Sequence, residues 1–425
     1  MTEPLSATTA HRARVVVPVD GEPIADGAVI VRGGLVVAVG PAGELLREHA
    51  GARVHEWAGT LTPGLVNAHT HLCFTSYEEF YGNGLAFPEW IQGFARRNPS
   101  MTPDDWRAST ADGVARSIAA GVTAVSDVVT PAASFDVLLS SALRGTAFYE
   151  VVGADDSIWA VEGPVWTAAL EAAIGQVNGG MTVGVSPHTL FTLSTSVQVA
   201  LLTLARERRL RLHPHVAESP AESLYVHSAS GPIAEMVARI GWQFEILAAG
   251  GTGHSPTLQN EVLGALGEDC HVAHGVHTDS ADRAVLRKHG TAVALCARSN
   301  ARLDCGDAPV AAYREEGNPV AVGTDSLASS PDLDILGELP ALRELALSQG
   351  SGEHDLDRWL LTAATAGGAR ALGGAAEYGT ITPGKRADFA VFAVADERSP
   401  YSALVSDGAG SCVATTIGGR IVHGG

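Results

Sequence analysis

Lysine is nearly absent from this sequence of 425 residues, with Lys288 and Lys385 as its two copies. The net charge is -19 and no basic cluster is present, so nucleic acid and anionic membrane surfaces are not expected as partners. No apolar run reaches the roughly 18 residues of a membrane-spanning helix. The first fourteen residues also lack the apolar segment of a secretion signal.

Cysteine is scarce as well, and its spacing excludes two common uses. The five cysteines are odd in number, scattered and never in C-x-x-C form. This pattern indicates neither a disulfide framework nor a zinc ribbon, and it favours reduced thiols in the cytoplasm. The glycine-rich run AAGGTGHSP lacks the Lys-Ser/Thr tail of a phosphate-binding loop, so we interpret it as a flexible loop.

The two ends of the chain share a β-rich texture. Alternating apolar residues with Gly, Pro and Asp between them fill residues 13–58, and a similar texture returns near the C-terminus. We predict one small β-sandwich domain built from residues 1–58 plus 376–425. Residues 59–375 are then a second domain inserted between these ends.

The middle of the chain alternates between apolar runs and stretches of helical texture. This alternation predicts a parallel sheet in an α/β fold, and eight units favour a (β/α)8 TIM barrel. A doubly wound sheet is the alternative, but no G-x-G-x-x-G opens a helix after the first strand. The predicted strands are Leu61–His69, Gly121–Val128, Thr146–Gly153, Met181–His188, Leu210–Val216, Cys270–Val276, Thr291–Cys296 and Pro319–Asp325.

The first predicted strand ends in His69-Thr70-His71. Side chains two residues apart on a strand point to the same face, so this H-x-H directs two imidazoles at one point. Imidazole is the commonest metal ligand in proteins, although two surface histidines would give the same pattern.

Metal-competent residues also stand at the ends of other predicted strands. They are His188, His215 followed by Glu218, His274, and Asp325. The carboxyl ends of the strands of a parallel barrel face one mouth, so we expect these side chains to converge.

The chemistry of this set predicts a catalytic metal. Three imidazoles and one carboxylate suit one Zn²⁺, with Fe²⁺ as the alternative. Such an ion lowers the pKa of bound water to about 7, and an unligated Glu218 could relay a proton. Two-metal hydrolases on such barrels often use a carboxylated lysine on a middle strand, and neither lysine lies on one. We therefore predict a mononuclear site, with Glu150 on the third strand as a residue that contacts substrate or forms a core hydrogen bond, and with metal ligation as its alternative role.

The sequence resembles the amidohydrolase superfamily, and within it the chlorohydrolase and nucleoside-deaminase branch. The resemblance rests on PGLVNAHTHL, AHGVH, RSNARL, GTDS and GTITPGKRADF, and on the H-x-x-E of residues 215–218. It implies His69, His71, His215 and Asp325 as metal ligands. It further implies Glu218 as the proton shuttle, His274 as the residue that polarises water, Asp325 as a proton carrier, and His188 as a contact to a sugar.

The branch includes deaminases of methylthioadenosine and adenosylhomocysteine, 6-aminodeoxyfutalosine and guanine, and triazine hydrolases. The first group has a glutamate shortly after an E-W pair, whereas Glu89-Trp90 is followed here by IQGFARRNP. Arg96 and Arg97 in that run, and Arg298, suit a substrate carboxylate.

We therefore expect a small-molecule substrate with a carboxylate. The substrate that these residues favour is 6-aminodeoxyfutalosine, an intermediate of menaquinone synthesis. Methylthioadenosine or another purine or pterin, a triazine-type chlorohydrolase and a non-enzymatic metal-binding protein are the alternatives. The resemblance is also compatible with a homo-oligomer.

Overall fold

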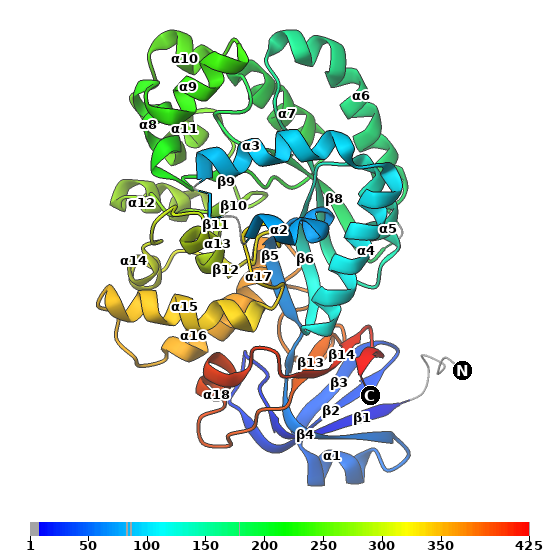
Figure 1. The fold of residues 1–425 in the computed structure, drawn as a ribbon. Coiled ribbons are helices and arrows are strands. Elements are labelled where there is room, and N and C mark those ends of the chain that lie inside the picture. The colour runs from blue at the N-terminus through cyan, green and yellow to red at the C-terminus, as the bar shows by residue number, and fades with distance from the viewer. Residues whose placement is uncertain (1–7, 82–83, 86, 178, 425) are drawn as a thin grey trace.

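The computed structural model describes residues 8–81, 84–85, 87–177 and 179–424. Residues 1–7 and 425 of the predicted terminal domain lie outside the described residues. Strands from both chain ends form a sheet at one end of the molecule, and helices surround a second group of strands at the other (Figure 1). Among the described residues no helix combines the length and the apolar character needed to cross a membrane.

The sheet at the chain ends, here called the end sheet, has seven strands in the order β15-β14-β13-β4-β1-β2-β3. Helix α1 (Ala42–Glu48) follows β3 and packs on this sheet. The strands are β1 Thr9–Val16, β2 Ile24–Arg32, β3 Leu35–Pro41, β4 Arg53–Pro63, β13 Phe389–Phe392, β14 Cys412–Ile417 and β15 Arg420–Gly424.

The predicted pairing of the two chain ends is present, and the predicted sandwich remains a prediction. All seven strands hydrogen-bond into one mixed sheet in the described part of the chain. The reason is β4, which pairs in parallel with β1 on one edge and antiparallel with β13 on the other. The predicted boundary between residues 58 and 59 falls inside β4, and the two-domain division remains a prediction.

Eight short parallel strands form the centre of the molecule, in two four-stranded sheets. Their orders are β5-β6-β7-β8 and β12-β11-β10-β9, so neighbours in sequence are neighbours in space. This sequential order differs from that of a doubly wound sheet. The strands are β5 Leu65–Thr70, β6 Val122–Val129, β7 Arg144–Val151, β8 Met181–Pro187, β9 His215–Val216, β10 His271–His274, β11 Ala292–Leu295 and β12 Val320–Val322.

Isolated parallel bridges connect the edges of the two sheets. Thr70 pairs with Asp325 at one edge, and Leu212 pairs with both Val185 and Cys270 at the other. Every residue of β5 and β6 is buried, as expected for parallel strands covered on both faces.

The helices follow the strands and cover them from outside (Figure 1). Local sequence sets several of their ends: Thr102 and Asp105 form a capping box at the start of α4, and Asp279 and Asp282 form one at α12. The remaining α-helices and their bounds are α2 Glu78–Tyr81, α3 Phe87–Arg97, α4 Pro103–Ala119, α5 Phe135–Ser140, α6 Asp156–Gly175, α7 Thr195–Glu207, α8 Pro220–Ser228, α9 Gly231–Ile240, α10 Glu245–Ala249, α11 Pro256–Val262, α12 Ser280–His289, α13 Ala297–Arg302, α14 Val310–Glu315, α15 Ile335–Ser348, α16 Leu356–Thr362, α17 Gly368–Ala371 and α18 Pro400–Asp407. Short 3₁₀ segments are η1 Leu72–Tyr77, η2 Asn98–Ser100 and η3 Ala132–Ser134, and η4 Ala363–Gly367 is a π-helix.

The end sheet is joined directly to the first central strand, because Gly64 is the one residue between β4 and β5. A side chain at Gly64 would collide with Thr123 on the neighbouring strand, so glycine is required for this close approach. A second link is the buried ion pair between Arg144 at the start of β7 and Asp388 just before β13. The position of the strand that ends in His69 therefore depends on the end sheet.

Candidate metal centre and active site

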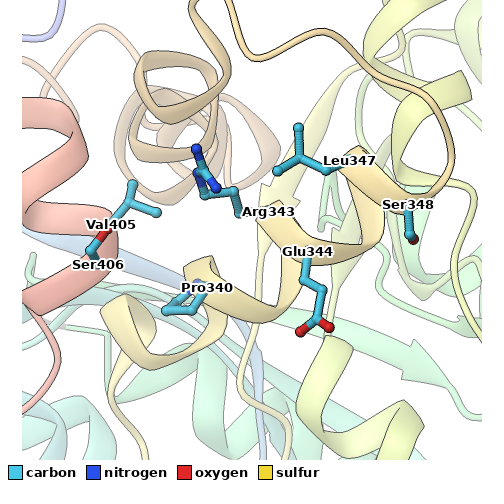
Figure 2. A pocket seen from close by; sticks show the side chains of 7 residues that line it. All are labelled: Pro340, Arg343, Glu344, Leu347, Ser348, Val405 and Ser406. Carbon is cyan, nitrogen blue, oxygen red and sulfur yellow. The ribbon is translucent and has the colours of Figure 1, made fainter.

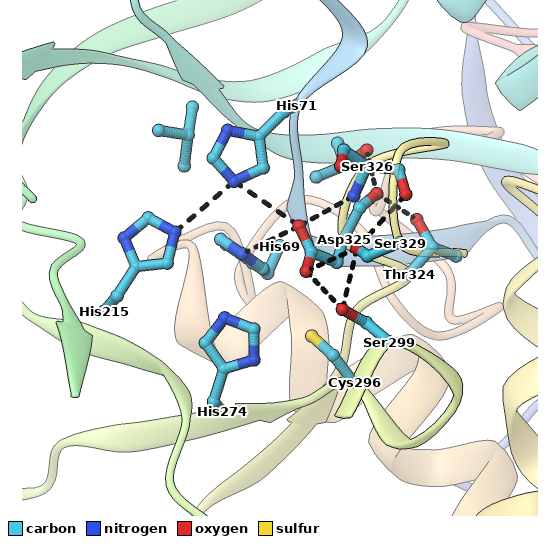
Figure 3. A network of polar contacts seen from close by, with 12 residues as sticks. His69, His71, His215, His274, Cys296, Ser299, Thr324, Asp325, Ser326 and Ser329 are labelled. Atoms are coloured by element: carbon cyan, nitrogen blue, oxygen red, sulfur yellow. Dashed lines mark hydrogen bonds and ion pairs between the residues drawn. The ribbon is translucent and has the colours of Figure 1, made fainter. Parts of the chain in front are cut away.

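Three imidazoles and one carboxylate meet at the carboxyl ends of the central strands (Figure 3). Asp325 Oδ1 lies 3.6 Å from His69 Nε2 and 3.5 Å from His71 Nε2. His215 Nε2 lies 3.3 Å from His71 Nε2. Ligands about 2.1 Å from a tetrahedral metal are about 3.4 Å apart, so these separations match the edges of a zinc tetrahedron.

The protonation states of this cluster also suit a divalent cation. Burial and the neighbouring His69 lower the pKa of His71 to about 3, and burial with His188 lowers that of His215 well below its usual value. Burial opposes ionisation of Asp325, but its contact with His69 lowers the pKa of its carboxyl. His69 Nε2 is buried without a hydrogen-bond partner. Neutral imidazoles and an ionised carboxylate are the forms that bind a metal, so the residues fit the ion.

Backbone pairing and three serines hold Asp325 in place. Its N–H donates to the carbonyl of His69 at 2.9 Å, which brings β12 to β5. Its carboxylate accepts from Ser299 Oγ at 2.5 Å, from Ser329 Oγ at 3.0 Å and from the Ser326 N–H at 2.7 Å (Figure 3). One oxygen is therefore directed at the imidazoles while hydrogen bonds fix the carboxylate plane.

Glu218 and His274 lie beside this cluster. His274 Nε2 is 3.6 Å from Glu218 Oε1, and both groups also lie within reach of Asp325. The pKa of Glu218 is raised by burial and by the nearby carboxylate of Asp325, which favours the protonated form. His274 Nδ1 is 3.0 Å from Asn300 Oδ1, an acceptor, so Nδ1 carries the proton and the Nε2 lone pair is directed toward the site.

Glu222 holds the turn that presents Glu218. The Glu222 carboxylate accepts from the N–H of Ala217 at 3.1 Å and from the N–H of Glu218 at 2.7 Å. Ala217 has a left-handed φ of 56°, and His274 and Asp325 share this conformation with φ of 71° and 63°. Left-handed backbone at non-glycine residues costs about 1 kcal/mol or more, and it concentrates at functional sites.

Glu150 and His188 form a second polar pair next to His215. Glu150 Oε1 lies 3.9 Å from both His188 Nε2 and His215 Nδ1, and it is buried without a hydrogen-bond partner. The other oxygen accepts from Thr130 at 2.7 Å. Burial raises the pKa of Glu150 to about 7. His188 Nδ1 is 2.9 Å from Thr192 Oγ1, which fixes the direction of the ring.

The three arginines predicted to bind a carboxylate have different surroundings. Arg96 is exposed on the last turn of α3. Arg97 is paired with Glu79 and lies over the Tyr77 ring at 4.4 Å.

Arg298 is committed to structural contacts. Its guanidinium donates to the buried carboxylate of Glu338 at 2.6 Å, to both oxygens of Asp332, and to the carbonyl of Asp334. This network leaves Arg298 little capacity to bind a substrate carboxylate. Local sequence does not indicate this network, because the acids follow more than 30 residues later.

The aromatic residues after His71 form a core beneath the loops. Phe74 contacts His71 at 5.7 Å between ring centroids and packs against Phe94 and Trp106. Trp90 Nε1 donates to the carbonyl of Ala328, which follows Asp325 in the chain. Helix α3 is therefore attached to the loops that carry two predicted metal ligands.

Several residues support the site without belonging to the predicted ligand set. Ser299 and Asn300, which follow the seventh predicted strand, hold Asp325 and His274. Glu222 had no assigned role. His213 is buried and lies 2.8 Å from His69 Nδ1. The H-x-H pattern of His213 and His215 was the available indication, since both side chains point the same way on extended backbone.

A separate groove lies between α15 and α18, with a volume of about 640 Å³ (Figure 2). Its lining is Pro340, Arg343, Glu344, Leu347, Ser348, Val405 and Ser406. Arg343 is paired with Asp357 at 2.9 Å, and none of the imidazoles described above lines the groove. We assign the chemistry to the imidazole cluster and not to this groove.

Fold and cluster together define an α/β protein built to hold a divalent metal among imidazoles. Residues 60–422 match the model of the amidohydrolase family, and the chain belongs to that family. The resemblance to amidohydrolases that we predicted from the sequence is confirmed. The prediction of a hydrolase acting on C–N bonds is confirmed as well. The family uses a divalent metal, in agreement with the donor set seen here.

Two relatives and one solved structure illustrate the similarity. The 5-methylthioadenosine/S-adenosylhomocysteine deaminase of Halobacterium salinarum is 31% identical over 393 residues, which cover 90% of this chain and 83% of the relative. The aminodeoxyfutalosine deaminase of Deinococcus radiodurans is 32% identical over 362 residues, covering 82% of each chain. An adenosine deaminase from Xanthomonas campestris with bound zinc has a TM-score of 0.81 at 24% identity, covering 98% of this chain and 93% of that one.

Proposed function

We propose that this protein is a zinc-dependent aminohydrolase that removes the amino group of an adenine-type nucleoside as ammonia. The observation that carries the proposal is the set of 3.3–3.6 Å separations among His69, His71, His215 and Asp325, beside a buried carboxyl at Glu218. Both relatives described above are named deaminases, one of 5-methylthioadenosine and S-adenosylhomocysteine and the other of aminodeoxyfutalosine. We further propose that the bridges at Thr70 and Leu212 close the central strands into a (β/α)8 barrel.

Each residue of the site has a distinct task in this reaction. When bound, the zinc ion supplies Lewis-acid activation of water. Glu218, protonated through its raised pKa, donates to the ring nitrogen and makes the adjacent carbon more electrophilic. His274 accepts a hydrogen bond from the incoming water through Nε2 and so orients it. Asp325 takes one proton from the water and passes it to the amino group, which leaves as ammonia, and the remaining hydroxyl proton returns to the Glu218 carboxylate.

Glu150 and His188 are placed to bind the polar part of the nucleoside. The unpartnered Oε1 of Glu150 can accept from a sugar hydroxyl, and His188 Nε2 lies 3.9 Å from it. A vicinal pair of hydroxyls could use both groups. Glu150 would then be the acid that binds the ribose. It would replace the glutamate that some deaminases of this branch have shortly after the pair equivalent to Glu89-Trp90.

We propose 6-aminodeoxyfutalosine, an intermediate of menaquinone synthesis, as the substrate. Its benzoate would be bound by an arginine, and the exposed Arg96 is the best candidate because Arg97 and Arg298 are paired with acids. Methylthioadenosine or adenosylhomocysteine is the alternative, supported by relatives of nearly the same identity. The scattered free cysteines favour a cytoplasmic site of action.

The test is a panel of adenine nucleosides given to pure protein loaded with zinc or with iron. Ammonia release and the change in ultraviolet absorbance are followed together for aminodeoxyfutalosine, methylthioadenosine, adenosylhomocysteine and adenosine. Preference for aminodeoxyfutalosine supports the specific substrate, and equal turnover of methylthioadenosine refutes it. Release of chloride or of a ring-opened acid from triazines or cyclic amides, without ammonia from any nucleoside, would overturn the deaminase proposal.

A further inference from the structure

We propose that His213 is a positioning residue that selects the tautomer of His69 and thereby directs the His69 Nε2 lone pair at the metal. The inference rests on the metal-binding part of the proposed function, and it concerns a residue outside the ligand set. It follows from a chain of three groups: the backbone carbonyl of His271, the ring of His213 and the ring of His69.

The first contact sets the proton on His213. His213 Nδ1 lies 2.9 Å from the carbonyl oxygen of His271. A carbonyl oxygen can only accept, so Nδ1 must donate and must carry the proton. The ring is fully buried, which favours its neutral form with a single N–H. His213 Nε2 is then an acceptor.

The second contact passes this choice to His69. His213 Nε2 lies 2.8 Å from His69 Nδ1, and an accepting Nε2 requires His69 Nδ1 to donate. The proton of His69 is therefore on Nδ1, and Nε2 keeps its lone pair. That nitrogen is the one that faces Asp325 and has no other hydrogen-bond partner.

The opposite tautomers would disable the site. With its proton on Nε2, His213 would face the carbonyl of His271 with a lone pair and would donate to His69 Nδ1. His69 would then carry its own proton on Nε2, which could not bind a metal. A backbone carbonyl, which has no proton to exchange, thus determines the tautomers of two rings in series.

The surroundings keep the His213 ring in this orientation. It stacks on the His271 ring with centroids 3.9 Å apart and an interplanar angle of 17°, and it packs on Phe148 at 5.1 Å. His271 is held in turn by Ser126 Oγ, 2.9 Å from its Nε2. The contacts join His271 on β10, His69 on β5 and Ser126 on β6 through His213, which lies two residues before β9.

Two carboxamide variants separate tautomer selection from packing. H213Q can place an amide oxygen near the position of Nε2, and so retains an acceptor for His69. H213N can retain a donor near the His271 carbonyl but is too short to reach His69 Nδ1. H11N is the matched control, because His11 is an equally buried histidine in the end sheet.

The experiment measures zinc affinity of the full-length proteins by competition with a chromophoric chelator, together with the unfolding midpoint of each zinc-loaded variant. Loss of a group that orients a metal ligand lowers affinity by about 10- to 100-fold, which is expected for H213N. H213Q should bind within a few-fold of wild type, and H11N should equal it. Equal affinity of H213N and wild type, or an equal loss in H213N and H213Q, would overturn the inference.

Neutron diffraction from wild-type crystals in heavy water decides the case if H213N does not fold. Deuterons on Nδ1 of both His213 and His69 are expected, and a deuteron on His213 Nε2 would refute the inference. Failure of the wild type to bind zinc would instead count against the proposed function. The tautomers would remain readable in that case, so the two failures are distinguishable.

Discussion

Replacing Glu218 by glutamine removes one transferable proton while keeping the size and hydrogen-bonding shape of the side chain. The Glu218 side chain is buried, with Oε1 3.6 Å from His274 Nε2. Its N–H donates to Glu222, a contact that the substitution does not alter. The metal ligands are untouched, so E218Q should fold and retain zinc.

The expected loss of kcat is about 1,000- to 10,000-fold, in the upper part of the range for general acid–base catalysis. This corresponds to about 4–5 kcal/mol in the activation free energy. We expect a loss of kcat in the upper part of this range because Glu222, a neighbouring acid, is unable to replace Glu218 as the proton donor. Both oxygens of Glu222 accept backbone N–H groups of the turn at residues 217–218, and its carboxylate is therefore committed.

The assay is ammonia release at saturating substrate, with metal content measured by mass spectrometry on the same sample. E162Q is the control, since Glu162 is exposed on α6 and bears the same substitution. An E218Q protein with full zinc and near-normal turnover would show that Glu218 does not shuttle the proton. A loss accompanied by loss of zinc would place its role in the metal site.

Three further predictions concern stability. Chelation of the metal should lower the free energy of unfolding by about 4 kcal/mol when zinc is present at 1,000 times its dissociation constant, and a thermal scan in which chelation leaves the midpoint unchanged would contradict this. R298M should destabilise the protein by about 3 kcal/mol, because it leaves the buried carboxylate of Glu338 without its partner, and KM should stay at the wild-type value; a raised KM with normal stability would return Arg298 to substrate binding. Burial and the nearby His55 lower the pKa of His11 to about 3, so the ring stays neutral in the folded protein while the unfolded chain takes up a proton below pH 6.5. Stability from His11 is therefore lost as the pH falls from 6.5 toward 3, by about 2 kcal/mol between pH 7 and pH 5. H11F should remove this part of the pH dependence in urea unfolding, and an unchanged dependence would show that His11 is not its source.

The sequence predicted most of the strand positions, because buried parallel strands require nearly continuous apolar runs. Met181–Pro187 falls inside its predicted strand, and Leu65–Thr70 overlaps the strand predicted over Leu61–His69 but begins four residues later and ends one residue later. The candidate metal ligands were identifiable for the same reason, since a polar residue that ends an apolar run interrupts a clear pattern. His215 and Asp325 stand at such points and meet His69 in space.

What the sequence did not reveal was pairing between distant residues. Ser299 holds Asp325 and Arg298 binds Glu338, and neither contact has a signature in local periodicity. The order of the strands in the end sheet was not predicted for a related reason: alternation identifies a strand but does not say which edges join. Which distant residues or strand edges come together depends on the register of strand pairing, and this register is set when the strands pack.

The direct passage from β4 through Gly64 into the strand of His69 has a consequence for synthesis of the protein on the ribosome. The C-terminal part of β4 is completed by β13, whose residues 389–392 are made more than 300 residues later. Contacts between such distant parts of the chain form slowly, because a long loop must close before they stabilise the fold. The strand that begins the site thus lacks its full support until β13 has been made. During that interval the nascent chain would depend on chaperones, and substitutions in β13 would lower the yield of active enzyme without touching the site.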